Sequence, residues 1–185
     1  MKRTFIAIKI PLTDTLKNKY ESIKELLWGD SVKWVNEHQL HLTLFFLGDT
    51  DEVKIKRINE KLIDIAGNIN RTFIEISGPG VFQSIKNPKV LWLGINITNE
   101  IMELQSLISE TLKESGFSPD NKQFKPHLTI GRIKNINNKN KLKQMIDNED
   151  KIVIERIPVN GFTFYESILT PKGPVYKILN TYSLK

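Results

Sequence analysis

Two short stretches decide the fold of this chain: HLTLFFL at residues 41–47 and HLTIGRI at residues 127–133. Each begins with the tripeptide His-Leu-Thr, although the 185-residue chain contains only three histidines. Both are short and apolar, which is typical of β-strands. Successive side chains of a strand point to opposite faces. The histidine and the threonine therefore share one face in each stretch, and the leucine between them points into a core.

The rest of the chain alternates between strand and helix patterns. Strands are predicted at 3–10, 32–35, 72–76, 89–95, 151–157, 161–168 and 174–183, and helices at 13–27, 55–65, 99–114 and, weakly, within 134–150. We expect residues 78–88 to form a loop and residues 171–174 a turn. This order has no regular βαβ repeat, which favours an α+β fold with largely antiparallel sheets.

The two His-Leu-Thr strands each follow a predicted helix, 13–27 in one case and 99–114 in the other. This matching order predicts an internal duplication of about half the chain each. No linker-like or low-complexity segment separates the halves. We therefore predict a single bilobal domain spanning residues 1–185, with one motif per lobe, at residues 41–44 and 127–130.

The composition narrows the classes of function. The chain has no cysteine, which excludes a disulfide scaffold, a thiolate zinc site and a cysteine nucleophile. Its formal net charge of +6 favours polyanionic partners, although a charge spread over the surface for solubility would look the same. No apolar stretch approaches membrane-spanning length, so we expect no membrane partner and a cytoplasmic location.

The repeated motif carries a specific chemistry. On one strand face, the imidazole and the hydroxyl stand roughly 6–7 Å apart. If the two strands lie side by side, His41, Thr43, His127 and Thr129 surround one small volume that suits a phosphate group. One neutral histidine could then take a proton from an attacking oxygen while a protonated histidine gives one to a leaving oxygen.

Two other interpretations compete with this one. A single His-x-Thr on a strand is usually structural, and only its repetition at matching places favours catalysis. A metal site is the rival chemical interpretation, but two histidines are too few for a catalytic zinc ion, which usually has three protein ligands. We therefore expect neither a metal nor another cofactor. The residues alone do not say which histidine is the acid.

The paired motifs resemble those of the 2H phosphoesterases, and in particular the bacterial and archaeal RNA 2′,3′-cyclic phosphodiesterases, formerly described as 2′-5′ RNA ligases. The similarity runs nearly from end to end. It is carried by RTFIAIKIP (3–11), WVNEHQLHLTLFFLGD (34–49), GPGVF (78–82), PKVLWLGI (88–95), GFSPDNKQFKPHLTIGR (116–132) and ESILTPKGPVYKIL (166–179).

The resemblance implies a bilobal α+β body with pseudo-twofold symmetry, outer helices and a central cleft that holds both motifs. It implies hydrolysis of a 2′,3′-cyclic phosphate at an RNA end to a 2′-phosphomonoester, without a metal. In that scheme His41 is the proton donor, His127 is the proton acceptor, and Thr43 and Thr129 bind the phosphate. Reverse 2′-5′ ligation would use the same groups. A monomer that binds RNA ends is expected.

Further substrate contacts are expected at Arg132, Phe45 and Tyr176. Arg132 could bind phosphate with two hydrogen bonds, but strict alternation places it on the face opposite His127, so a bulge or a strand end would be needed. Phe45 shares the face of His41 and could line the cleft or stack on a base. Two alternatives remain open: a module that binds RNA ends or nucleotides without turnover, and a phosphodiesterase acting on 2′-5′ oligonucleotides.

Overall fold

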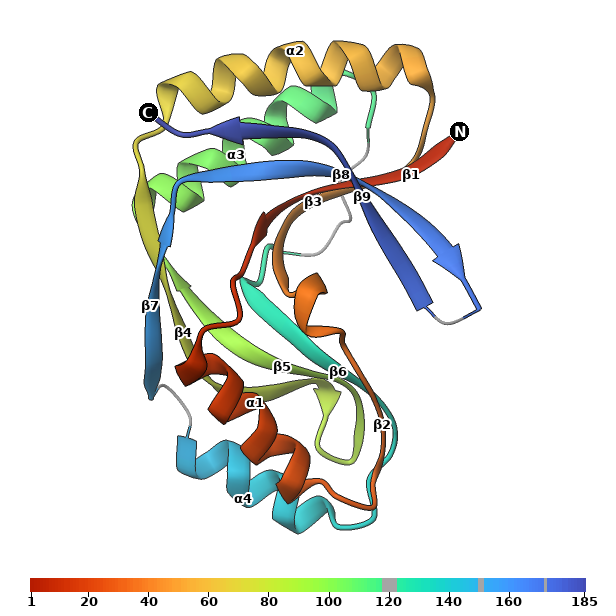
Figure 1. Ribbon diagram of the computed structural model, residues 1–185, viewed down its shortest axis with the longest axis vertical. Helices are drawn as coiled ribbons and strands as arrows, with labels where there is room; N and C mark the ends of the chain where they lie inside the picture. The colour runs from red at the N-terminus through yellow and green to blue at the C-terminus, as the bar shows by residue number, and fades with distance from the viewer. Residues whose placement is uncertain (118–122, 150–151, 172) are drawn as a thin grey trace.

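The computed structural model describes residues 1–117, 123–149, 152–171 and 173–185. Part of the GFSPDNKQFKP run and Lys172 of the predicted 171–174 turn lie outside these residues. The described strands form two sheets (Figure 1). A four-stranded sheet has the order β3 (His41–Thr50), β1 (Lys2–Lys9), β8 (Gly161–Thr170) and β9 (Gly173–Ser183). A five-stranded sheet has the order β2 (Ser31–Trp34), β6 (His127–Asn135), β5 (Asn87–Ile97), β4 (Thr72–Ser84) and β7 (Val153–Val159).

Every neighbouring pair of strands in these sheets is antiparallel. The predicted α+β fold with largely antiparallel sheets is therefore confirmed. Within the described ranges, none of the helices is long and apolar enough to cross a membrane.

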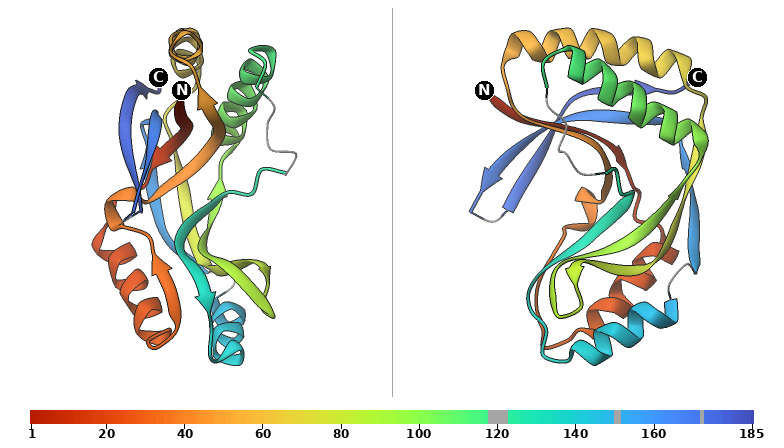
Figure 2. Two further views of the ribbon diagram at one scale, coloured as in Figure 1. Left: turned by 90° about the vertical axis from the view of Figure 1, so that its right-hand side faces the viewer. Right: turned by 180° about the vertical axis from the view of Figure 1, so that it is seen from behind.

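Four α-helices cover the described sheets on their outer sides (Figures 1 and 2). Helices α2 (Glu52–Asn68) and α3 (Asn99–Glu114) contact the four-stranded sheet, while α1 (Asp14–Leu26) and α4 (Lys139–Glu149) contact the five-stranded sheet. Their apolar residues recur at helical spacing and are buried, as with Leu16, Tyr20 and Ile23 of α1. A short 3₁₀-helix, η1 (Glu37–Gln39), leads into β3.

Each sheet is built from both halves of the chain. The four-stranded sheet takes β1 and β3 from the first half and β8 and β9 from the second. The five-stranded sheet takes β2 and β4 from the first half and β6 and β7 from the second, and its β5 crosses the midpoint of the chain. The helix pairs are mixed in the same way. One apolar core includes buried side chains of both sheets, so the relative position of the two motif strands depends on packing throughout the molecule.

The two motif strands carry the same irregularity. In β3, Thr43 pairs with Ala7 and Phe45 pairs with Ile6, so Leu44 is an extra residue. In β6, Thr129 pairs with Trp92 and Gly131 pairs with Leu91, so Ile130 is the extra residue. Such a β-bulge shifts the alternation of side chains by one position. In both strands, the residues after the bulge therefore point to the face opposite the one that strict alternation from the histidine predicts.

The bulge corrects the prediction for Phe45. Strict alternation places Phe45 on the face of His41, but the extra residue Leu44 turns Phe45 into the core, where its side chain is only 6% exposed. Phe46 points outward instead and is 45% exposed. The guanidinium of Arg3 lies over the Phe46 ring, 5.0 Å from its centroid.

The predicted loop at 78–88 is also wrong. Strand β4 continues to Ser84 and pairs with β5 through a hairpin. A register shift between Ile76 and Pro79 accommodates the proline within the strand. Gly80 is needed for close packing, because a Cβ there would come within 2.2 Å of the Trp92 ring. Glycine and proline therefore mark a bulge in this strand and do not end it.

Because the bulge in β3 buries Phe45 and exposes Phe46, we expect substitution of these two residues to affect stability unequally. Phe45→Ala should lower the free energy of unfolding by about 3–5 kcal/mol, because it leaves a cavity in the core. Phe46→Ala should lower it by less than about 1 kcal/mol, because its ring is half exposed. Urea denaturation of both variants measures this difference. Equal losses would contradict the placement of the bulge.

Candidate active site

A pocket of about 610 Å³ lies between the two sheets and contains both motifs. His41 and Thr43 come from β3, and His127 and Thr129 come from β6. The two strands contact each other. Leu42 and Leu128, the central residues of the two tripeptides, are buried on the opposite faces. The structure therefore brings together the four groups that the sequence placed in one site.

Both imidazoles are oriented by the same hydrogen bond. The Nδ1 of His41 lies 2.6 Å from the carbonyl oxygen of Gln39, and the Nδ1 of His127 lies 2.6 Å from that of Lys125. A carbonyl oxygen can only accept, so Nδ1 carries a proton in both rings. The Nε2 atoms are then the ones that gain or lose a proton. Each motif thus provides one imidazole of fixed tautomer.

Aromatic rings pack on the two imidazoles unequally. His41 lies between Phe5, at 5.2 Å between ring centroids, and Tyr176, whose ring meets it edge-on at 5.4 Å. His127 contacts Phe82 edge-on at 4.6 Å. Tyr176, which the sequence suggested as a substrate contact, therefore lines the pocket and covers His41. Phe82 borders the site from the β4–β5 hairpin.

This packing lowers the pKa of both histidines. Burial is the main cause at His41, and repulsion from His127 lowers its pKa further, while the hydrogen bond to Gln39 acts in the opposite direction. Burial also lowers the pKa of His127, against the hydrogen bond to Lys125. A positive charge on His127 therefore disfavours protonation of His41.

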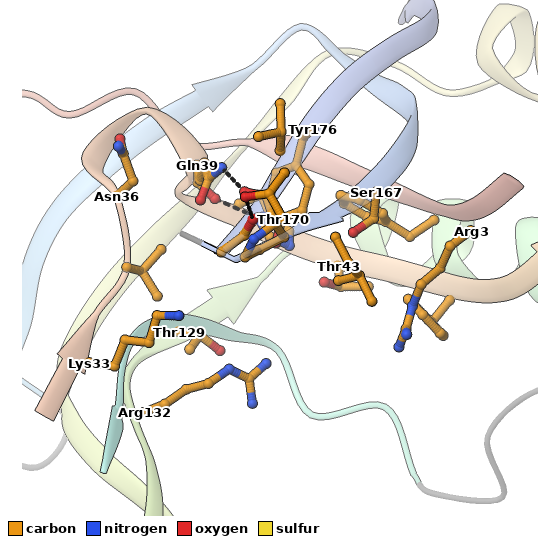
Figure 3. Close-up of a pocket in the computed structure, with 18 of the residues that line it drawn as sticks. Arg3, Lys33, Asn36, Gln39, Thr43, Thr129, Arg132, Ser167, Thr170 and Tyr176 are labelled. Atoms are coloured by element: carbon orange, nitrogen blue, oxygen red, sulfur yellow. Dashed lines mark hydrogen bonds between the residues drawn. The ribbon is translucent and has the colours of Figure 1, made fainter. Parts of the chain in front are cut away.

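The pocket is electrically suited to an anion. Arg3, Lys33 and Arg132 line it around Thr43 and Thr129 (Figure 3). No Asp or Glu lies among its described lining residues. Two threonine hydroxyls and two guanidinium groups can donate hydrogen bonds to phosphate oxygens. The arrangement can therefore hold a phosphodiester between two titratable imidazoles.

The bulge in β6 explains how Arg132 reaches this pocket. Ile130 is the extra residue, so Arg132 lies on the same side as His127 and Thr129. Phe46 holds the equivalent position in β3, five residues after His41, and also lines the pocket. The pocket thus has an arginine at one of the two equivalent positions and an aromatic ring at the other.

Sequence inspection missed several lining residues. Arg3 and Lys33 look like scattered surface charges, and no local pattern marks them. Phe46 becomes visible only through the bulge, and Gln39 only through its position two residues before His41. His38 is exposed and forms no part of this pocket. Among the residues that the structure describes, no three His, Asp or Glu side chains come together as a metal ion would require.

Comparisons with known proteins identify the family of this chain. Residues 15–166 match the family model described as the 2'-5' RNA ligase superfamily. The chain is 39% identical to an RNA 2',3'-cyclic phosphodiesterase of Thermotoga maritima over 96% of this chain and 92% of that protein. It is 35% identical to one of Archaeoglobus fulgidus, over 97% and 99% of the two chains. The chain belongs to the 2'-5' RNA ligase superfamily, whose members are 2H phosphoesterases.

Solved structures share the fold. TT0787 of Thermus thermophilus superposes with a TM-score of 0.81 at 25% identity, covering 98% of this chain and 97% of that one. E. coli LigT in complex with 3'-AMP superposes with a TM-score of 0.75 at 21% identity, covering 100% and 98%. The predicted 2H phosphoesterase-like fold is thus confirmed.

The lowered histidine pKa values make stability depend on pH. Well above the ordinary value of 6.5, both imidazoles are neutral in the folded and unfolded chain. Below it, the unfolded chain binds protons that the folded chain resists. The free energy of unfolding should therefore fall as the pH drops from about 7.5 to about 5.5, across the ordinary histidine titration.

Urea denaturation across this range measures the effect. The double variant His41→Gln/His127→Gln should show a smaller pH dependence than the unmodified protein. The matched control is His38→Gln, which removes an exposed imidazole and should keep the dependence. A dependence that survives in the double variant would contradict the assignment to these two residues.

Proposed function

We propose that this protein is an RNA 2′,3′-cyclic phosphodiesterase that hydrolyses a terminal 2′,3′-cyclic phosphate to a 2′-phosphomonoester. His41 is the proton donor and His127 the proton acceptor, and no metal takes part. The full-length similarity to proteins named for this activity supports the reaction. The observation that carries the proposal is the pair of anchored imidazoles in one cationic pocket.

The reaction proceeds by attack of water on the phosphorus atom. His127 takes a proton through Nε2 as the water oxygen bonds to phosphorus. The bond between phosphorus and O3′ breaks, and His41 gives its Nε2 proton to O3′. The 2′ ester bond stays intact, so the product carries a 2′-phosphate and a free 3′-hydroxyl. In ligation, a 5′-hydroxyl would take the place of the attacking water, and the product would be a 2′-5′ linkage.

The lining residues have matching roles. Thr43 and Thr129 donate hydrogen bonds to the two non-bridging oxygens of the phosphate. Arg132 adds a guanidinium on the side of His127, and Arg3 and Lys33 attract the charged RNA end. Tyr176 beside His41, and Phe46 further along β3, provide aromatic surfaces in the pocket on which a base can stack. Phe45, buried in the core, has no part in binding.

The assay uses a short RNA ending in 2′,3′-cyclic phosphate, incubated with the protein in excess EDTA. The unmodified protein should form the 2′-phosphate, and separation of the 2′- and 3′-phosphate products identifies the bond that is broken. His41→Ala and His127→Ala should each lower the rate by about 10²- to 10⁴-fold, because each removes one proton transfer. The exposed His38→Ala variant is the matched control.

Other outcomes would overturn parts of the proposal. Tight binding without turnover would indicate a module that holds RNA ends. Turnover of 2′-5′ oligonucleotides in place of the cyclic phosphate would indicate the other phosphodiesterase activity. Loss of activity in EDTA that is restored by added metal would contradict the metal-free mechanism.

A further inference from the structure

Gln39 makes two hydrogen bonds that connect different parts of the site. Its carbonyl oxygen accepts from Nδ1 of His41 at 2.6 Å. Its side-chain Nε2 donates to the carbonyl oxygen of Pro174 at 2.6 Å (Figure 3). Pro174 lies near the start of β9, in the β8–β9 hairpin. A single residue thus joins the orientation of His41 to the position of this hairpin.

The segment around Gln39 is itself held firmly. The Gln39 amide donates to the carbonyl oxygen of Asn36 at 2.8 Å, and the Asn36 side chain accepts from the His38 amide at 2.9 Å. Leu40 is buried, and its carbonyl oxygen accepts from the Ile10 amide at 3.0 Å. The backbone of Gln39 is therefore a fixed point to which the hairpin is tied.

The tied hairpin carries the ring that covers His41. Tyr176 follows Pro174 by two residues, so the two share one side of β9. Its ring meets His41 edge-on at 5.4 Å and Phe5 at 4.9 Å. The end of β8 and the start of β9 project together away from the body of the molecule (Figure 1). The hydrogen bond from Gln39 holds this extended element against the rest of the pocket.

We propose that Gln39 is a positioning residue for the acid histidine: its side chain ties the β8–β9 hairpin in place, so that Tyr176 stays packed on the imidazole that the Gln39 carbonyl orients. The proposal rests on the role of His41 proposed above. Gln39 acts through His41 and Tyr176 and has no proton transfer of its own.

The second motif lacks this device. Lys125 stands in the equivalent place, two residues before His127, and its carbonyl oxygen accepts from Nδ1 of His127 in the same way. Its side chain is exposed and makes no hydrogen bond among the described residues. Both motifs thus have a backbone carbonyl oxygen that accepts from the histidine Nδ1, but in the described part of the chain only the first has a side chain, that of Gln39, which also bonds a hairpin. Lys125 is therefore a matched control for Gln39.

Other titratable and charged groups also face His41 and must be considered in any titration. Those nearest His41 are Lys9 of β1, His38 of η1, Tyr165 of β8 and Tyr176 of β9. The others line the pocket: Arg3, Lys33, His127 and Arg132. None of them is altered by a change at Gln39 that leaves its charge at zero.

The test uses Gln39→Met, which keeps the length and zero charge of the side chain and removes the donor. The imidazole signals of the free protein are followed by NMR across pH, with His41→Gln and His127→Gln used for assignment. In Gln39→Met, the pKa of His41 should rise toward its ordinary value as Tyr176 loosens, and that of His127 should change less. The same experiment on Lys125→Met should leave the His41 titration in place.

Kinetics with the RNA cyclic phosphate provides the second readout. Gln39→Met should lower kcat by about tenfold, because the acid is less well placed, with a smaller change in KM. A raised KM with an unchanged His41 titration would overturn the proposal and make Gln39 a direct substrate contact. An unchanged titration with unchanged kinetics would overturn it as well.

A separate result would distinguish failure of the proposed function. If the unmodified protein does not turn over the RNA but Gln39→Met still shifts the titration of His41, the positioning holds and the reaction is wrong. Tyr176→Ala serves as a second variant, since it removes the ring directly. It should shift the His41 titration in the same direction as Gln39→Met, and the absence of a shift would overturn the proposal even if Gln39→Met does not fold.

Discussion

The site depends on one constraint: each motif strand has one face in the apolar core and the other in the pocket. One extra residue in each strand decides which of the following side chains point into the pocket. Leu42 and Leu128 fill the core while the neighbouring histidines and threonines face the pocket. After each threonine, the bulge shifts the alternation. Without it, Arg132 would point into the core, where an unpaired guanidinium is strongly destabilising. The bulges thus place Arg132 and Phe46 in the same pocket as the histidines and threonines of the two motifs.

The separation of the two imidazoles is fixed by the whole molecule. The two motif strands belong to different sheets, and both sheets contain strands from both halves of the chain. The outer helix pairs are mixed in the same way. Moving one motif relative to the other would therefore disturb the shared core. Such interleaving provides the fixed geometry that a paired acid and base require.

The parts of the site that follow from strand alternation could be predicted from the sequence. His41 and Thr43 share a face because they are two residues apart, and so do His127 and Thr129. Features set by pairing between strands could not be predicted, because a bulge depends on the register of the partner strand. For this reason the sequence predicts Phe45 on the pocket face although it lies in the core, and it predicts a loop around Gly80 although the strand continues there. Arg3 and Lys33 line the pocket, but no local sequence pattern marks them.

The two histidines make the same hydrogen bond to a backbone carbonyl oxygen, but different aromatic rings pack on them. This difference bears on their proposed roles. Burial disfavours the protonated form of His41, and a charge on His127 disfavours it further. Under the proposed mechanism, His127 begins neutral, which removes that repulsion. The bound phosphodiester then places a negative charge beside His41 and raises the pKa of its imidazole. The proton that O3′ requires is therefore held most firmly when the substrate is present. A buried acid that is readily neutral in the empty pocket is thus consistent with donation in the occupied one.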